Sequence, residues 1–214
     1  MNNNLTELVF IIDRSGSMSG LESDTIGGFN SLIEKQKTEE GEVIVTTVLF
    51  NDTVTVVHDG LKIANIPKMT RKDYVPGGCT ALLDAVGTTV NRIAEKQTML
   101  KDEFTPGKTM VVITTDGLEN SSREYSYERV KKVIERQKEL GWEFIFLGAN
   151  IDVCSEAAKF GVDRENAVKF NCDSTGIDIQ YEALGCAIKE LRKRGSIGKG
   201  WRKPLDRDVS SRGS

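Results

Sequence analysis

The sequence has few of the residues that build zinc sites, disulfide frameworks or histidine-dependent active sites. Its 214 residues include four cysteines, none in a CxxC pair, and a single histidine, His58. Scattered cysteines support neither a zinc site nor a disulfide framework. One histidine at the end of a predicted strand argues against most hydrolases that use histidine as the base. We therefore expect free thiols and a structural role for His58.

Long apolar runs are also missing. The longest early run, residues 8–12, has five members and stops at Asp13, whereas a bilayer helix needs roughly 20 apolar residues. Residues 1–4 carry no basic side chain, and a run of five is too short for a secretory signal. A cytoplasmic protein is therefore expected. With 38% hydrophobic and 29% charged residues, the chain has the composition of one globular domain.

Charge is distributed unevenly along the chain. The net charge is −3, yet residues 192–214 contain eight basic and two acidic side chains, which leaves −9 on residues 1–191. This end is rich in Gly and Ser and has no apolar period. We predict a domain over residues 1–193 and a basic, disordered tail over residues 194–214. Such a tail can contact nucleic acid, although a solvated terminus without a partner is the simpler interpretation.

Apolar runs alternate with amphipathic segments in the rest of the chain. Two β-branched runs, 43–50 and 53–58, are separated only by Asn51 and Asp52 and predict a hairpin. The other predicted strands are 5–12, 110–115, 143–147 and 167–170, and the predicted helices are 21–38, 83–100, a segment from about 130 to Gly141, 153–160 and 177–191. The alternation predicts an α/β fold with helices on both faces of a mostly parallel sheet and one antiparallel strand.

Oxygen-bearing side chains follow two of the predicted parallel strands. Asp13, Ser15 and Ser17 occupy alternate positions after residues 5–12, and Asp116 follows residues 110–115. Alternate residues of an extended loop can face one point, and the carboxyl ends of parallel strands meet at one edge of the sheet. Oxygen ligands suit a hard cation, with Mg²⁺ favoured and Mn²⁺ possible. Taken singly, each residue is also compatible with capping a turn or helix.

A third segment makes the pattern specific. Thr80 ends a long loop that contains Pro76, Gly77 and Gly78, and such loops are often functional. The DxSxS loop, Thr80 and Asp116, in this order, resemble the metal ion-dependent adhesion site of von Willebrand factor type A (vWA) domains, as found in intracellular bacterial or phage members.

This resemblance implies a three-layer, Rossmann-like fold with strand order 3-2-1-4-5-6. It implies that Ser15 and Ser17 bind the metal directly, that Thr80 does so in the ligand-bound form, and that Asp13 and Asp116 act directly or through water. It further implies that a partner protein supplies an Asp or Glu to the metal. The function expected on this basis is a non-catalytic, metal-dependent protein-binding module. Its expected partner is a protein, such as a component of an ATPase machine or a stress response, rather than a membrane.

The sequence leaves two other functions open. One is a metal-dependent hydrolase of phosphate esters, although the chain has no GxxxxGK[ST] loop and no evident general base near the metal loop. The other is a nucleic-acid-associated protein that acts through its basic tail, with nucleic acid the less favoured partner.

Overall fold

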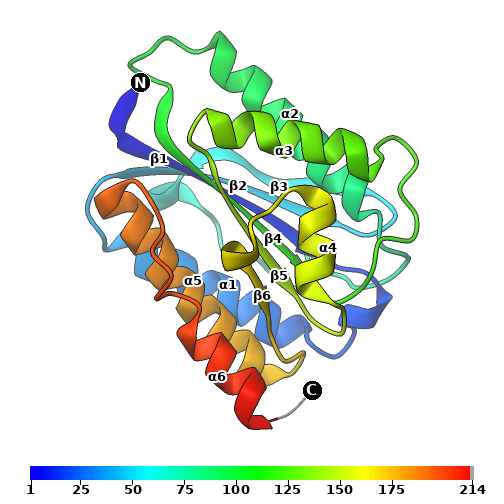
Figure 1. Ribbon diagram of the computed structural model, residues 1–214. Helices are drawn as coiled ribbons and strands as arrows, with labels where there is room; N and C mark the ends of the chain where they lie inside the picture. Colours follow the sequence, from blue (N-terminus) through cyan, green and yellow to red (C-terminus); the bar gives the residue numbers. More distant parts are fainter. Residues whose placement is uncertain (213–214) are drawn as a thin grey trace.

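The computed structural model, which describes residues 1–212, is built around a six-stranded sheet with the order β3-β2-β1-β4-β5-β6 (Figure 1). The strands are β1 (Asn2–Asp13), β2 (Glu42–Phe50), β3 (Val54–Lys62), β4 (Pro106–Thr115), β5 (Glu143–Gly148) and β6 (Ala167–Lys169). Every neighbouring pair is parallel except the β2–β3 hairpin. The predicted strand order and the single antiparallel strand are confirmed.

Helices cover both faces of the sheet (Figure 1). Helices α1 (Glu22–Lys37) and α5 (Ser174–Arg194) lie on one face, and α2 (Leu82–Met99), α3 (Tyr127–Glu139) and α4 (Val153–Phe160) lie on the other. In β1, Leu8 and Phe10 pack toward the first face, whereas Val9 and Ile11 pack toward the second. A strand that is covered on both sides is apolar at consecutive positions, which explains the uninterrupted run in the sequence. No helix within residues 1–212 is both long and apolar enough to cross a membrane.

Three strands, β1, β3 and β4, extend at one end by three or more residues beyond the range that their apolar runs predict. β1 begins at Asn2, whose N–H donates to the carbonyl oxygen of Thr105 at 2.8 Å. β3 continues past His58 to Lys62, with a register irregularity opposite residues 45–48 of β2. The His58 ring is buried and stacks on Phe29, with ring centroids 6.1 Å apart. Backbone pairing, rather than hydropathy, sets these strand ends.

The prediction of a disordered tail is wrong for residues 203–212. They form helix α6 (Lys203–Arg212), which packs against α5 and β6 (Figure 1). Trp201 and Leu205 are buried in the core on the α1 and α5 face. Arg212 forms ion pairs of 2.6 Å with both Asp173 and Asp208. Trp201, Leu205 and Val209 recur at the i, i+4 spacing of a helix, a signal that the charged and Gly-rich composition of the segment conceals. The last two residues of the predicted tail, 213 and 214, lie outside the described residues.

We expect Leu205→Ala to release α6 from the body of the protein. Leu205 is fully buried, and removing a buried leucine costs about 2 kcal/mol or more. Because α6 packs mainly against α5 and β6, the loss should appear as local opening, with amide exchange in residues 201–212 faster by roughly 30-fold. Hydrogen-exchange mass spectrometry measures this directly. Arg207→Ala, an exposed position in the same helix, is the control, and equal exchange in the two variants would contradict the docking.

Candidate metal centre

The loop after β1 brings together three of the predicted site residues. The Asp13 carboxylate is fully buried; its Oδ1 accepts from the Ser15 N–H at 2.7 Å and its Oδ2 from the Thr115 hydroxyl at 2.6 Å. A short 3-10 turn, Gly16–Met18, follows and places the Oγ atoms of Ser15 and Ser17 3.1 Å apart. The two hydroxyls therefore face the same point, as their alternate spacing predicts.

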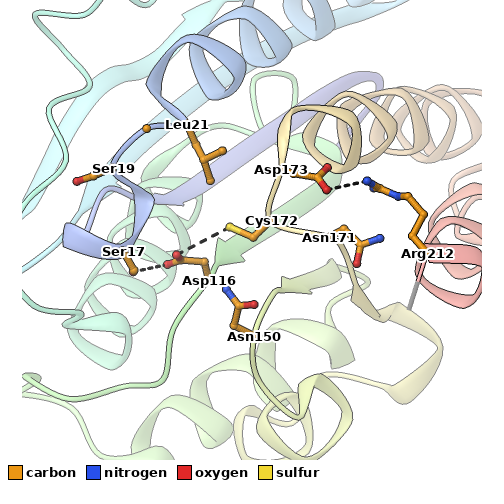
Figure 2. Close-up of a pocket in the computed structure, with 10 residues that line it drawn as sticks. Ser17, Ser19, Leu21, Asp116, Asn150, Asn171, Cys172, Asp173 and Arg212 are labelled. Carbon is orange, nitrogen blue, oxygen red and sulfur yellow. Dashed lines mark hydrogen bonds and ion pairs between the residues drawn. The ribbon is translucent and has the colours of Figure 1, made fainter. Parts of the chain in front are cut away.

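Asp116 reaches the same point from the end of β4, the neighbour of β1. The Ser17 hydroxyl donates to Asp116 Oδ1 at 2.6 Å, as Figure 2 shows. A Cβ atom added at Gly117 would lie 3.7 Å from Thr80 Oγ1 and 3.9 Å from Ser17 Oγ. The Thr80 and Ser17 hydroxyls thus both lie beside Gly117, the residue that follows Asp116. The structure places all three predicted segments at one edge of the sheet.

The capping alternative explains only part of this arrangement. Ser15 precedes the 3-10 turn but makes no side-chain cap, and α1 is preceded by Leu21. Thr80 is not the N-cap of α2, because that position is Ala81. Asp13 does close a turn through the Ser15 N–H. The hydroxyls of Ser15, Ser17 and Thr80 are therefore not used to cap helices.

Thr80 is held by Asn120, one of the polar residues that follow Asp116 in the sequence. The Thr80 N–H donates to Asn120 Oδ1 at 2.8 Å, and the Asn120 N–H donates to the Thr80 carbonyl oxygen at 3.1 Å. Next to it, the Glu119 carboxylate accepts from the N–H groups of Leu83 (2.8 Å) and Ser122 (2.7 Å). The only signal in the sequence is a polar cluster that follows Asp116.

The β2–β3 turn fixes the other side of the Thr80 segment. Both carboxylate oxygens of Asp52 accept from the Cys79 N–H at 3.1 Å, and Asn51 Nδ2 donates to the Gly77 carbonyl oxygen at 2.8 Å. Gly78 has φ +76°, and a Cβ there would lie 1.9 Å from Asp52 Oδ2. Only glycine fits this close approach.

The electrostatics of the site favour a cation. Among residues 1–212, no ion pair involves Asp13 or Asp116. Burial raises the pKa of Asp13, although hydrogen bonds from Thr115 and Ser15 oppose this effect. Two nearby carboxylates without a cationic partner are costly to bury, and a divalent ion offsets that cost.

Cys172 lies beside this carboxylate pair but is not poised to bind metal. Its Sγ is 3.9 Å from Asp116 Oδ2 (Figure 2). Burial, followed by the charge of Asp116, raises the pKa of the thiol to about 11. A thiol must lose its proton to act as a ligand, and the groups that converge on Ser17 are oxygen atoms. No three His, Cys, Asp or Glu side chains gather within residues 1–212, and any metal here must use the hydroxyls too.

An open depression adjoins the site. Ser17 and Asp116 form one wall, and Asn150, Asn171 and Arg212 contribute to the rest (Figure 2). Arg212 comes from α6, so the C-terminal segment is part of this surface. The residues present thus fit a hard divalent cation that is reached from solvent. As metal ligands, Asp13, Ser15, Ser17, Thr80 and Asp116 remain predictions.

Solved structures with this fold include proteins with a bound metal. The vWF domain of the type V pili tip protein Mfa5 from Porphyromonas gingivalis has a TM-score of 0.63 and 10% identity, covering 90% of this chain and 98% of that one. Manganese-loaded TRAP protein of Plasmodium vivax has a TM-score of 0.58 and 19% identity, with 84% and 73% covered. Proximal thread matrix protein 1 of the mussel byssus, with a zinc-occupied MIDAS motif, has a TM-score of 0.60 and 13% identity, with 85% and 47% covered.

At these identities the likeness concerns the fold. The chain spans slightly less than half of the mussel protein. No protein-family model matches the sequence, and no curated protein matches it either. The similarity is therefore carried by the strand order, the helical layers and the placement of the loops at one edge of the sheet.

Proposed function

We propose that this chain, which has the von Willebrand factor type A fold, is a non-catalytic module that binds a protein partner through a divalent cation. The observation that carries the proposal is the convergence of carboxylates and hydroxyls from three separate segments. The Ser17 hydroxyl contacts both Ser15 and Asp116, and the Thr80 hydroxyl lies beside Gly117, the residue that follows Asp116. The metal-loaded structures that share this fold support a divalent ion.

Different roles follow for the two kinds of oxygen ligand. Ser15, Ser17 and Thr80 would hold the ion through neutral hydroxyls, and Asp116 would balance its charge nearby. Both oxygens of Asp13 already accept hydrogen bonds, so Asp13 would contribute charge, directly or through water. When bound, the ion would supply the positive charge that attracts a carboxylate of the partner. We propose Mg²⁺, because an oxygen-only donor set suits it and it usually keeps a position for an external ligand.

The features around the site also support a non-catalytic role. The lining of the depression contains no histidine, and the Cys172 thiol is protonated at neutral pH because its pKa is about 11. The bases in that lining are the carboxylates of Asp116, which would balance the charge of the ion, and of Asp173, which pairs with Arg212 at 2.6 Å, so both are already engaged. The partner's Asp or Glu would instead be the group that the site recognises.

An array of short peptides tests this proposal directly. Each peptide carries one Asp or Glu, and its matched copy carries Asn or Gln at that position. We expect a subset of the acidic peptides to bind the chain in Mg²⁺, and we expect the amide copies to bind at least about tenfold more weakly, since they lack the charge that the metal requires. Fluorescence anisotropy measures the affinities.

Chelation and turnover provide the controls for this experiment. EDTA should abolish binding, as should Asp116→Ala in the presence of Mg²⁺. Binding that persists in EDTA, or equal binding of acidic and amide peptides, would refute the metal-bridged mechanism. Mg²⁺-dependent hydrolysis of p-nitrophenyl phosphate that is lost in Ser15→Ala would refute the non-catalytic role.

A further inference from the structure

Asn120 and Thr80 form a closed pair of hydrogen bonds. The Asn120 side chain accepts from the Thr80 N–H at 2.8 Å, while the Asn120 N–H donates to the Thr80 carbonyl oxygen at 3.1 Å. Both backbone polar groups of Thr80 are therefore bound by one residue. Thr80 is only 3% exposed, and fixing its peptide groups fixes the direction of its Cα–Cβ bond. The position of the Thr80 hydroxyl thus depends on Asn120.

Asn120 is itself anchored to α2. The neighbouring Glu119 carboxylate accepts from the Leu83 N–H at 2.8 Å and from the Ser122 hydroxyl at 2.7 Å. The Ser122 hydroxyl oxygen in turn accepts from the Asp84 N–H at 3.0 Å. The loop that begins at Asp116 is therefore fastened to the start of α2, which directly follows Thr80.

We propose that Asn120 is a positioning residue that sets the Thr80 hydroxyl at the metal site. The inference rests on the proposed function, because it requires a cation between Thr80, Ser17 and Asp116. Through Asn120, the segment of Asp116 and the segment of Thr80 move as one unit. Residues that orient metal ligands typically change metal affinity by 10- to 100-fold when they are removed.

A thermodynamic cycle tests whether Asn120 acts through Thr80. The four proteins are wild type, Asn120→Ala, Thr80→Ala and the double variant, each titrated with Mn²⁺ alone and followed by calorimetry or electron paramagnetic resonance. We expect Asn120→Ala to weaken Mn²⁺ binding by about tenfold. In the Thr80→Ala background, the same substitution should have no further effect. Asn120→Asp, which keeps an acceptor for the Thr80 N–H, should restore binding.

Ser122→Ala is the matched control for damage to the loop. It removes the two hydrogen bonds of the Ser122 side chain, to Glu119 and from the Asp84 N–H, but leaves the Asn120–Thr80 pair intact. It should therefore lower the thermal midpoint and change the Mn²⁺ affinity much less than Asn120→Ala does. Additive effects in the cycle, or equal loss of affinity in Ser122→Ala and Asn120→Ala, would overturn the inference. If wild type binds Mn²⁺ and Asn120→Ala binds it equally, only this inference fails. If the folded wild type binds no Mn²⁺, the proposed function fails with it.

Discussion

The Ser15→Ala/Asp116→Ala double variant is expected to bind neither Mg²⁺ nor Mn²⁺, whereas the wild-type chain should bind one ion per molecule. The substitutions remove a hydroxyl that lies 3.1 Å from Ser17 Oγ and the carboxylate that accepts the Ser17 hydroxyl at 2.6 Å. Loss of a ligand together with a compensating charge should weaken binding by more than about 100-fold. Isothermal titration after EDTA treatment and dialysis measures the difference.

Ser19→Ala/Asp178→Ala makes a suitable control for this measurement. It removes the same two kinds of side chain from exposed positions outside the proposed ligand set, and it should bind metal like the wild type. The site variant should also keep its circular dichroism spectrum, since Asp116 forms no ion pair among residues 1–212 whose loss would disturb the fold. Saturable binding in the folded site variant would show that the ion binds elsewhere.

Arg192→Ala is expected to lower the free energy of unfolding by about 3 kcal/mol, because Arg192 holds the end of α1. Its guanidinium donates to the carbonyl oxygens of Gln36 (2.8 Å), Glu39 (2.8 Å) and Glu40 (2.7 Å), and more weakly to that of Gly41 (3.2 Å). Gln36 lies in the last turn of α1, and Glu39, Glu40 and Gly41 lie in the connection from α1 to β2, so Arg192 supplies donors where the regular helical hydrogen bonds have ended. A cation at this position also complements the helix dipole.

Arg194→Ala provides the comparison for the stability measurement. Arg194 is two residues further along α5, and its side chain is 75% exposed in an ion pair with Glu190. Exposed pairs of this kind contribute at most about 1 kcal/mol. Urea denaturation should therefore separate the two variants clearly. Equal unfolding free energies would mean that the hydrogen bonds of Arg192 add little to the stability of the protein.

Much of the fold could be predicted because buried strands and half-buried helices have different patterns of apolar residues. β1, buried on both faces, appears in the sequence as an unbroken apolar run that stops at Asp13. The positions of Ser15 and Ser17 could be predicted for a similar reason, since alternate residues of an extended loop face the same way. Asp116 was identified because it ends a second buried strand, and the structure places that strand beside β1.

Other features depend on contacts between residues that are distant in the sequence. Asn120 and Glu119 act through side-chain bonds to backbone groups more than 30 residues away, at Thr80 and Leu83. Helix α6 depends on two buried side chains, Trp201 and Leu205. The composition of a segment does not reveal such contacts, because they depend on which distant segments lie side by side in the folded protein.

The distance between Ser17 and Asp116 in the sequence also determines when, during synthesis, the chain contains both sides of the proposed metal site. The two residues are 99 positions apart, and β1 lies between β2 and β4 at the centre of the sheet. A ribosome therefore releases the DxSxS loop long before the strand that completes it. Contacts of such long sequence range form late in folding. A nascent chain that stops before Asp116 has no carboxylate to place opposite Ser17, so capture of the proposed cation would report that the central strands have been made and paired.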